Sequence, residues 1–138
     1  WLEEYVLIQV EKVSTQLVIQ DFGMGLEPVQ RSAMSNRFEL DVAAMIGYQL
    51  FAISCMAAVP KGRAAYKEHL LEAFVRARQL GGDEARVGLV CFYADAAQLE
   101  AELQETWLTQ DAIRVFGRSH LPDLDIHLRD WFESANLP

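Results

Sequence analysis

The sequence predicts an all-α protein, a compact bundle of about five or six helices. Two observations favour this class: apolar residues recur at helical spacing in several long segments, and glycines and prolines fall between those segments. With 138 residues, 51% of them hydrophobic and 23% charged, the chain is long enough to bury a core of its own. We therefore expect an ordered globular protein.

The first helix is expected over about residues 2–21. Gly23 follows at a position typical of a helix C-cap. The same segment is rich in β-branched residues, so a two-stranded hairpin within 5–20 is the rival interpretation, although no Asn-Gly or Asp-Gly turn supports it. The apolar residues that recur at steps of four, four, three and four are Leu2, Val6, Val10, Val13 and Leu17.

Residues 24–37 lack an apolar period and contain a proline, which predicts a linker. A helix is expected next, from about residue 39 or 41 to 58. It is apolar on nearly every side, so it should lie at the centre of the bundle. After Pro60 and Gly62, an amphipathic pattern predicts another helix over about 63–80.

Residues 84–108 are expected to form one long helix, because apolar residues step by three and four along the whole segment. The alternative is a buried strand near 87–93, followed by a separate helix that Asp95 and Gln98 would begin as a variant capping box. Together with the N-terminal hairpin, that strand would make the fold α+β instead of all-α.

The C-terminal part is expected to add a short helix over about 109–116 and a last helix that Pro122 opens. The predicted organisation is an N-terminal amphipathic helix (1–23), a linker (24–37) and a helical domain (38–138). Because Met34 resembles an internal start, the first segment could also be a tethered partner for the groove of the helical domain.

The charge and the cysteines limit the classes of function. A formal net charge of -8 repels phosphate backbones and anionic lipids, so we expect neither nucleic acid nor a membrane as a partner. The most apolar window, 43–59, is too short to span a bilayer. Only Cys55 and Cys91 are present, both in apolar runs, which is typical of buried free thiols in a reducing cytoplasm.

No catalytic, cofactor-binding or metal-binding motif is recognisable. The strongest candidate is the pair His120 and His127, with Asp123 and Asp125 between them. Two histidines seven positions apart do not match the usual spacing of zinc ligands, so we predict no metal and no cofactor. A small metal-binding protein or enzyme centred on His120 and His127 is the alternative hypothesis, and a non-enzymatic function is favoured.

The favoured hypothesis is therefore a small acidic protein-binding module of the adaptor, secretion-chaperone or toxin-neutralising type. Such a module would hold an amphipathic helix in an apolar groove, and its partner would be a protein with basic or helical character. The sequence is also compatible with a homodimer. The predicted partner-binding residues are Leu2, Val6, Val10, Val13 and Leu17 in the first helix and Glu100, Glu102, Glu105, Asp123 and Asp125 on later acidic faces.

Overall fold

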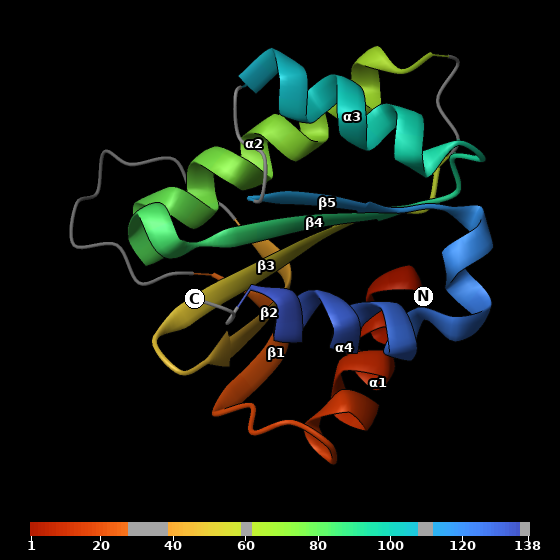
Figure 1. Cartoon of the computed structure of the whole chain (residues 1–138). Coiled ribbons are helices and arrows are strands. Elements are labelled where there is room, and N and C mark those ends of the chain that lie inside the picture. The colour runs from red at the N-terminus through yellow and green to blue at the C-terminus, as the bar shows by residue number, and fades with distance from the viewer. Residues whose placement is uncertain (28–38, 59–61, 108–111, 136–138) are drawn as a thin grey trace.

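The computed structural model describes residues 1–27, 39–58, 62–107 and 112–135. Within these ranges the chain forms a mixed five-stranded sheet between two layers of helices (Figure 1). The predicted all-α bundle is therefore wrong, and the fold is of the α+β class that was the alternative. The elements are α1 (Leu2–Ser14), β1 (Asp21–Leu26), β2 (Leu40–Ile46), β3 (Gln49–Met56), α2 (Ala64–Gly81), β4 (Arg86–Cys91), α3 (Ala96–Trp107), β5 (Ile113–Phe116) and α4 (Leu124–Ser134), with short 3₁₀ turns η1 (Gly82–Glu84) and η2 (Arg118–Asp123).

The strands lie in the order β1-β2-β3-β4-β5. The first three are antiparallel, and β3, β4 and β5 run parallel to one another. Parallel neighbours cannot be joined by a tight turn, and here α2 connects β3 to β4 while α3 connects β4 to β5. These two helices cover one face of the sheet, and α1 and α4 cover the other (Figure 1).

Each face of the sheet has its own hydrophobic core. On the face of α1 and α4, Phe51 of β3 makes edge-on ring contacts with Trp131 and Phe132 of α4. On the face of α2 and α3, fully buried Leu70 and Leu99 pack over the strands. The central strands are thus buried on both sides, which makes their sequences almost continuously apolar.

This burial on both sides explains why the predicted central helix over 39–58 is wrong. The segment is the hairpin of β2 and β3, in which Ile46 pairs with Gln49 across a two-residue turn. Gly47 occupies the first turn position with φ of 62°, a conformation that glycine adopts at little cost. An apolar run without alternation predicts a buried helix and a doubly buried strand equally well.

The predicted single helix over 84–108 is also wrong, and the alternative drawn from Asp95 and Gln98 is the correct one. Residues Arg86–Cys91 form β4, and α3 begins separately at Ala96. The Asp95 carboxylate accepts a hydrogen bond from the backbone N–H of Gln98, at 3.1 Å. This is the N-cap interaction that ends the strand connection and starts the helix.

At the N-terminus, a helix and not a hairpin is present, but it ends at Ser14 and does not reach residue 21. β1 then occupies Asp21–Leu26, which includes the end of the predicted helix and the start of the predicted linker. Residues 28–37 of that linker lie outside the described residues. The division into an N-terminal segment, a linker and a domain stays a prediction. The third part, 38–138, is not purely helical, because it contains strands.

Of the remaining predicted helices, one is confirmed and the others differ from the structure. The helix predicted over 63–80 is confirmed as α2. In place of the short helix over 109–116, the described part of that segment contains β5 at Ile113–Phe116. Pro122 lies in η2, and the last helix begins at Leu124. Among the described residues, no helix is long and apolar enough to cross a membrane.

Candidate functional site

Asp41 is a charged residue near the start of a strand that is otherwise mostly buried. Its Oδ2 atom accepts a hydrogen bond from the backbone N–H of Cys55 at 2.8 Å and another from the Ser54 hydroxyl at 3.4 Å. The register of the hairpin, in which Val42 pairs with Ile53, brings Asp41 opposite Ser54 one step further on. β3 therefore fixes the position of the Asp41 carboxylate.

His69 faces this carboxylate from the helix that covers the sheet. It lies on α2 between Tyr66 and Leu70, two residues that are buried against the strands. Its Nε2 atom is 3.9 Å from Asp41 Oδ2, a distance typical of an ion pair but too long for a direct hydrogen bond. Nε2 is buried and has no hydrogen-bond partner among the described residues.

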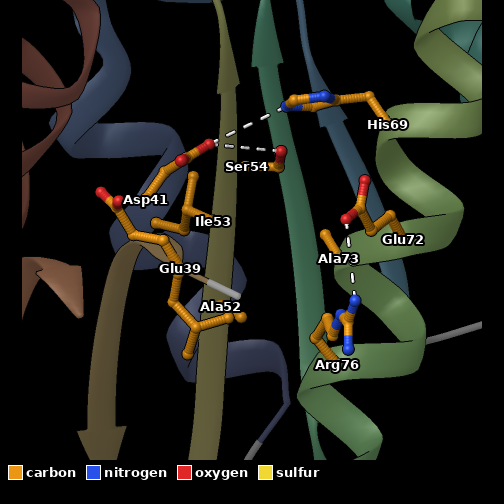
Figure 2. Close-up of a pocket in the computed structure, with 10 residues that line it drawn as sticks. Glu39, Asp41, Ala52, Ile53, Ser54, His69, Glu72, Ala73 and Arg76 are labelled. Atoms are coloured by element: carbon orange, nitrogen blue, oxygen red, sulfur yellow. Dashed lines mark hydrogen bonds and ion pairs between the residues drawn. The ribbon is translucent and has the colours of Figure 1, made fainter. Parts of the chain in front are cut away.

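These side chains border a pocket of about 250 Å³ between β2, β3 and α2. Figure 2 shows the Asp41 carboxylate directed toward both Ser54 and His69, and Glu72 directed toward Arg76 one helical turn further along α2. Acidic and basic groups thus alternate around the opening. The pocket is lined by Glu39, Leu40, Asp41, Ala52, Ile53, Ser54, His69, Glu72, Ala73 and Arg76.

Asp41 and His69 shift each other's pKa in opposite directions. Burial alone would raise the pKa of Asp41, but the interaction with His69 and the hydrogen bond from the Cys55 amide outweigh burial and lower this pKa. The Asp41 carboxylate raises the pKa of His69, against an opposing effect of burial. The pocket therefore contains a fixed carboxylate beside an imidazole that holds its proton more tightly than a free histidine.

Asp41, Ser54 and His69 are not among the predicted site residues. Gly47 is the sequence feature that could have indicated Asp41 and Ser54. A turn at that glycine pairs 46 with 49 and so pairs 41 with 54, which places a carboxylate beside a hydroxyl. The position of His69 depends on which helix covers the sheet, and this could be inferred only once the strands were recognised.

The structure does bring His120 and His127 together, in a second pocket of about 250 Å³ that is separate from Asp41. Their ring centroids are 4.7 Å apart, and the rings meet edge to face. His120 Nδ1 accepts a hydrogen bond from the Gly117 N–H at 2.9 Å, and burial followed by the charge of His127 lowers the pKa of His120. Glu100 and Arg114 also line this pocket.

A metal centre at this histidine pair is not supported. Within the part of the chain that the structure describes, no group of three or more histidine, cysteine, aspartate or glutamate side chains could hold a metal ion. The nearby Glu100 carboxylate is engaged elsewhere: it accepts the backbone N–H of Val115 at 2.8 Å and lies 3.8 Å from Arg114.

The two cysteines are free and buried, on opposite faces of the sheet. Burial raises the pKa of the Cys55 thiol far above its ordinary value, and the charges of Asp41 and Glu3 raise it further. Burial likewise raises the pKa of Cys91. Because the thiolate is the nucleophilic form, neither cysteine is suited to nucleophilic catalysis.

The predicted partner-binding residues occupy two kinds of environment. In α1, Leu2, Val6, Val10 and Val13 are buried in the chain's own core, and Leu17 is half-buried beyond the end of the helix.

The acidic candidates lie nearer the surface. Glu102 forms ion pairs with Arg63 and Lys67 of α2. Glu100 is half-buried, Glu105 and Asp123 are exposed, and Asp125 lies in the first turn of α4.

Solved structures support the same fold. Protein VC1899 from Vibrio cholerae is 27% identical over 98% of this chain, with a TM-score of 0.78. Can2 from Sulfobacillus thermosulfidooxidans, solved in complex with cyclic tetra-adenylate (cA4), is 19% identical over 95% of the chain, with a TM-score of 0.69. This chain spans only 34% of the first and 35% of the second, about a third of each. None of the curated proteins compared with the chain matches it.

A sequence model described as "Card1-like, endonuclease domain" matches residues 1–135. This match contradicts two predictions, that the chain is a protein-binding adaptor or chaperone and that nucleic acid is not among its partners. It also favours the enzyme class of the alternative hypothesis, although not a centre at His120 and His127. Because the match extends over nearly the whole sequence, the chain belongs to the Card1-like endonuclease domain family.

Proposed function

We propose that this chain is the nuclease-fold domain of a larger protein that acts on nucleic acid, and that the sugar-phosphate backbone is bound at the Asp41 pocket. Membership of an endonuclease domain family supports the class of substrate. The single observation that supports this pocket is the Asp41–His69 pair, a positioned carboxylate and imidazole beside an opening of about 250 Å³.

The residues of the pocket suit contact with a phosphodiester. Nucleic-acid backbones are bound chiefly by cationic side chains and by N–H and hydroxyl donors. Here α2 contributes His69 and Arg76, and β3 contributes the Ser54 hydroxyl. The Asp41 carboxylate favours the protonated form of His69, and a protonated imidazole can donate a hydrogen bond to an incoming phosphate oxygen.

The net charge of -8 opposes tight binding by this domain alone. Binding would instead depend on the local cationic groups of α2 and on other parts of the larger protein. VC1899 and Can2 are about three times as long as this chain, and this difference in length supports the existence of such parts. The cyclic tetra-adenylate in the Can2 complex is a ligand of that protein, and for this domain we propose a polynucleotide.

The test is a binding measurement on the protein that contains this domain, with fluorescently labelled single-stranded RNA, single-stranded DNA and duplex DNA in EDTA. Wild type is compared with His69→Ala and Arg76→Ala, which remove the two cationic groups, and with Glu105→Gln as a control for an exposed charge on α3. We expect weaker binding of at least one polymer in both α2 variants and no loss in the control. Equal binding in all four proteins, or no binding at all, would refute the proposed site.

A further inference from the structure

Nucleases commonly hydrolyse phosphodiesters with divalent cations, which are held by several oxygen ligands and above all by carboxylates. Three acidic residues line the Asp41 pocket, so their directions decide whether it could form such a centre. The Glu39 carboxylate lies over β1, where a Cβ built on Gly25 would be 3.2 Å from its Oε1. The Glu72 carboxylate is directed toward Arg76, with 4.0 Å between Oε1 and Nη2 (Figure 2). Only Asp41 is directed toward His69.

The Oδ2 atom of Asp41 already has three neighbours. It accepts the Cys55 N–H and the Ser54 hydroxyl, and His69 Nε2 lies 3.9 Å away. A metal ion at Oδ2 would have to displace the imidazole, and it would also meet the positive charge of Arg76 at the same opening. The His69 imidazole and a divalent ion would therefore compete for the Asp41 carboxylate.

The β3 side of the pocket does not provide the missing ligands. Side chains alternate along a strand, so Ser54 and Met56 lie on the same face of β3 as the pocket. A neutral hydroxyl is a weak ligand for Mg²⁺ or Mn²⁺, and a thioether is the wrong class, because these hard cations prefer charged oxygen donors. The described residues, accordingly, contain no group of three metal-ligating side chains here either. The residues present do not fit a divalent metal centre.

We propose that the His69 imidazole occupies, beside Asp41, the place that a divalent cation takes in a metal-dependent nuclease, so that this domain binds a polynucleotide without metal-dependent cleavage. The inference rests on the proposed function, since it assumes that nucleic acid reaches this pocket. The contact between the two groups supports it: His69 Nε2 lies 3.9 Å from Asp41 Oδ2, Asp41 raises the pKa of His69, and His69 acts to lower the pKa of Asp41.

Metal binding tests the inference directly, by titration calorimetry with Mn²⁺. Wild type should show no saturable site tighter than about 1 mM, the weak end of protein sites for such hard cations. The double variant Ser54→Glu/His69→Ala adds a carboxylate beside Asp41 and removes the competing cation, and it should bind Mn²⁺ at least about tenfold more tightly. Adding Asp41→Asn to that double variant should abolish the gain.

The variants need a control for folding, because a carboxylate on β3 could disturb the hairpin. Ser54→Asp/His69→Ala has a shorter side chain and serves as the second version, and each protein is first compared with wild type by thermal denaturation. A saturable Mn²⁺ site in wild type that Asp41→Asn removes would overturn the inference. So would the absence of any gain in both folded double variants.

Nucleic-acid assays separate this inference from the proposed function. Binding in EDTA, with no cleavage when Mn²⁺ or Mg²⁺ is added, would support both. Cleavage that requires the metal and is lost in Asp41→Asn would overturn the inference and leave the proposed function standing. If no polymer binds under either condition, the proposed function itself fails.

Discussion

His69 Nε2 lies 3.9 Å from Asp41 Oδ2, so that α2 and β2 are joined by an ion pair at the edge of a pocket. The backbone N–H of Cys55 donates a hydrogen bond to the same carboxylate oxygen, and the buried Nε2 atom of His69 has no hydrogen-bond partner among the described residues. Asp41 is the main cause of the raised pKa of His69, whereas the pKa of Asp41 also depends on burial and on the Cys55 amide.

The first prediction concerns the titration of His69. Because the Asp41 carboxylate is the main reason that the pKa of His69 is raised, Asp41→Asn should lower this pKa. Imidazole ¹⁵N chemical shifts followed against pH by NMR measure the effect. Glu105→Gln, which neutralises an exposed carboxylate on α3, should leave the titration curve unchanged. An unchanged curve in Asp41→Asn would mean that the ion pair does not exist in solution.

The second prediction concerns stability against pH. A histidine whose pKa is raised by folding stabilises the protein fully below its unfolded pKa of 6.5, and this stabilisation is lost as the pH rises through the folded pKa. Asp41, whose pKa is lowered by folding, limits the stabilisation at low pH. The stabilisation from Asp41 is present above pH 3.8 and is lost as the pH falls below that value. The pair should therefore stabilise the fold most between these two limits.

Urea unfolding of wild type and His69→Gln at about pH 5.5 and about pH 9 measures this pair. Since the His69 side chain is 40% exposed, we expect the variant to lose only about 0.5 kcal/mol at the lower pH and almost nothing at the higher. His120 has the opposite dependence, because its pKa is lowered, but it is present in both proteins and cancels in the difference. A larger loss at the higher pH would contradict the prediction.

The third prediction concerns the start of α3. Asp95 accepts the Gln98 N–H, so Asp95→Ala should remove a helix cap and lower the free energy of unfolding by about 1 kcal/mol. Glu105→Ala, also an acidic residue at an exposed position of α3, is the matched control and should change it by less than about 0.5 kcal/mol. Equal effects of the two substitutions would show that Asp95 is not a cap.

The helices α2 and α3 show how much of the fold could be predicted from the sequence. α2 was predicted almost to the residue, because it is amphipathic and lies between glycines at 62 and 81–82. The strand at 86–91 is hidden because Leu89 and Phe92 continue, towards the N-terminus, the helical row of Ala96, Leu99 and Leu103 in α3. Two apolar residues at helical spacing are enough to hide a boundary that Asp95 marks.

The candidate site could not be predicted for a related reason. Its two halves come from a doubly buried hairpin and from the helix that crosses over it. Apolar residues on both faces of β2 and β3 remove the alternation that identifies a strand, so Asp41 appeared to be the start of a helix. The net charge is a poor predictor of the partner, because it describes the whole surface and not the α2 side of one pocket.

The last prediction concerns Gly117, which follows β5. A Cβ at this position would lie 2.3 Å from the backbone oxygen of Tyr93 and 2.8 Å from the Cβ of Ala96. Backbone cannot move away as a flexible side chain can, so Gly117→Ala should lower the free energy of unfolding by about 2–3 kcal/mol. Gly62→Ala is the control, since nothing lies within 4 Å of its added Cβ and its φ is not positive, and it should stay within about 0.5 kcal/mol of wild type. Urea denaturation of the three proteins measures both values, and equal stability of Gly117→Ala and Gly62→Ala would show that β5 does not approach the β4–α3 connection as closely as described.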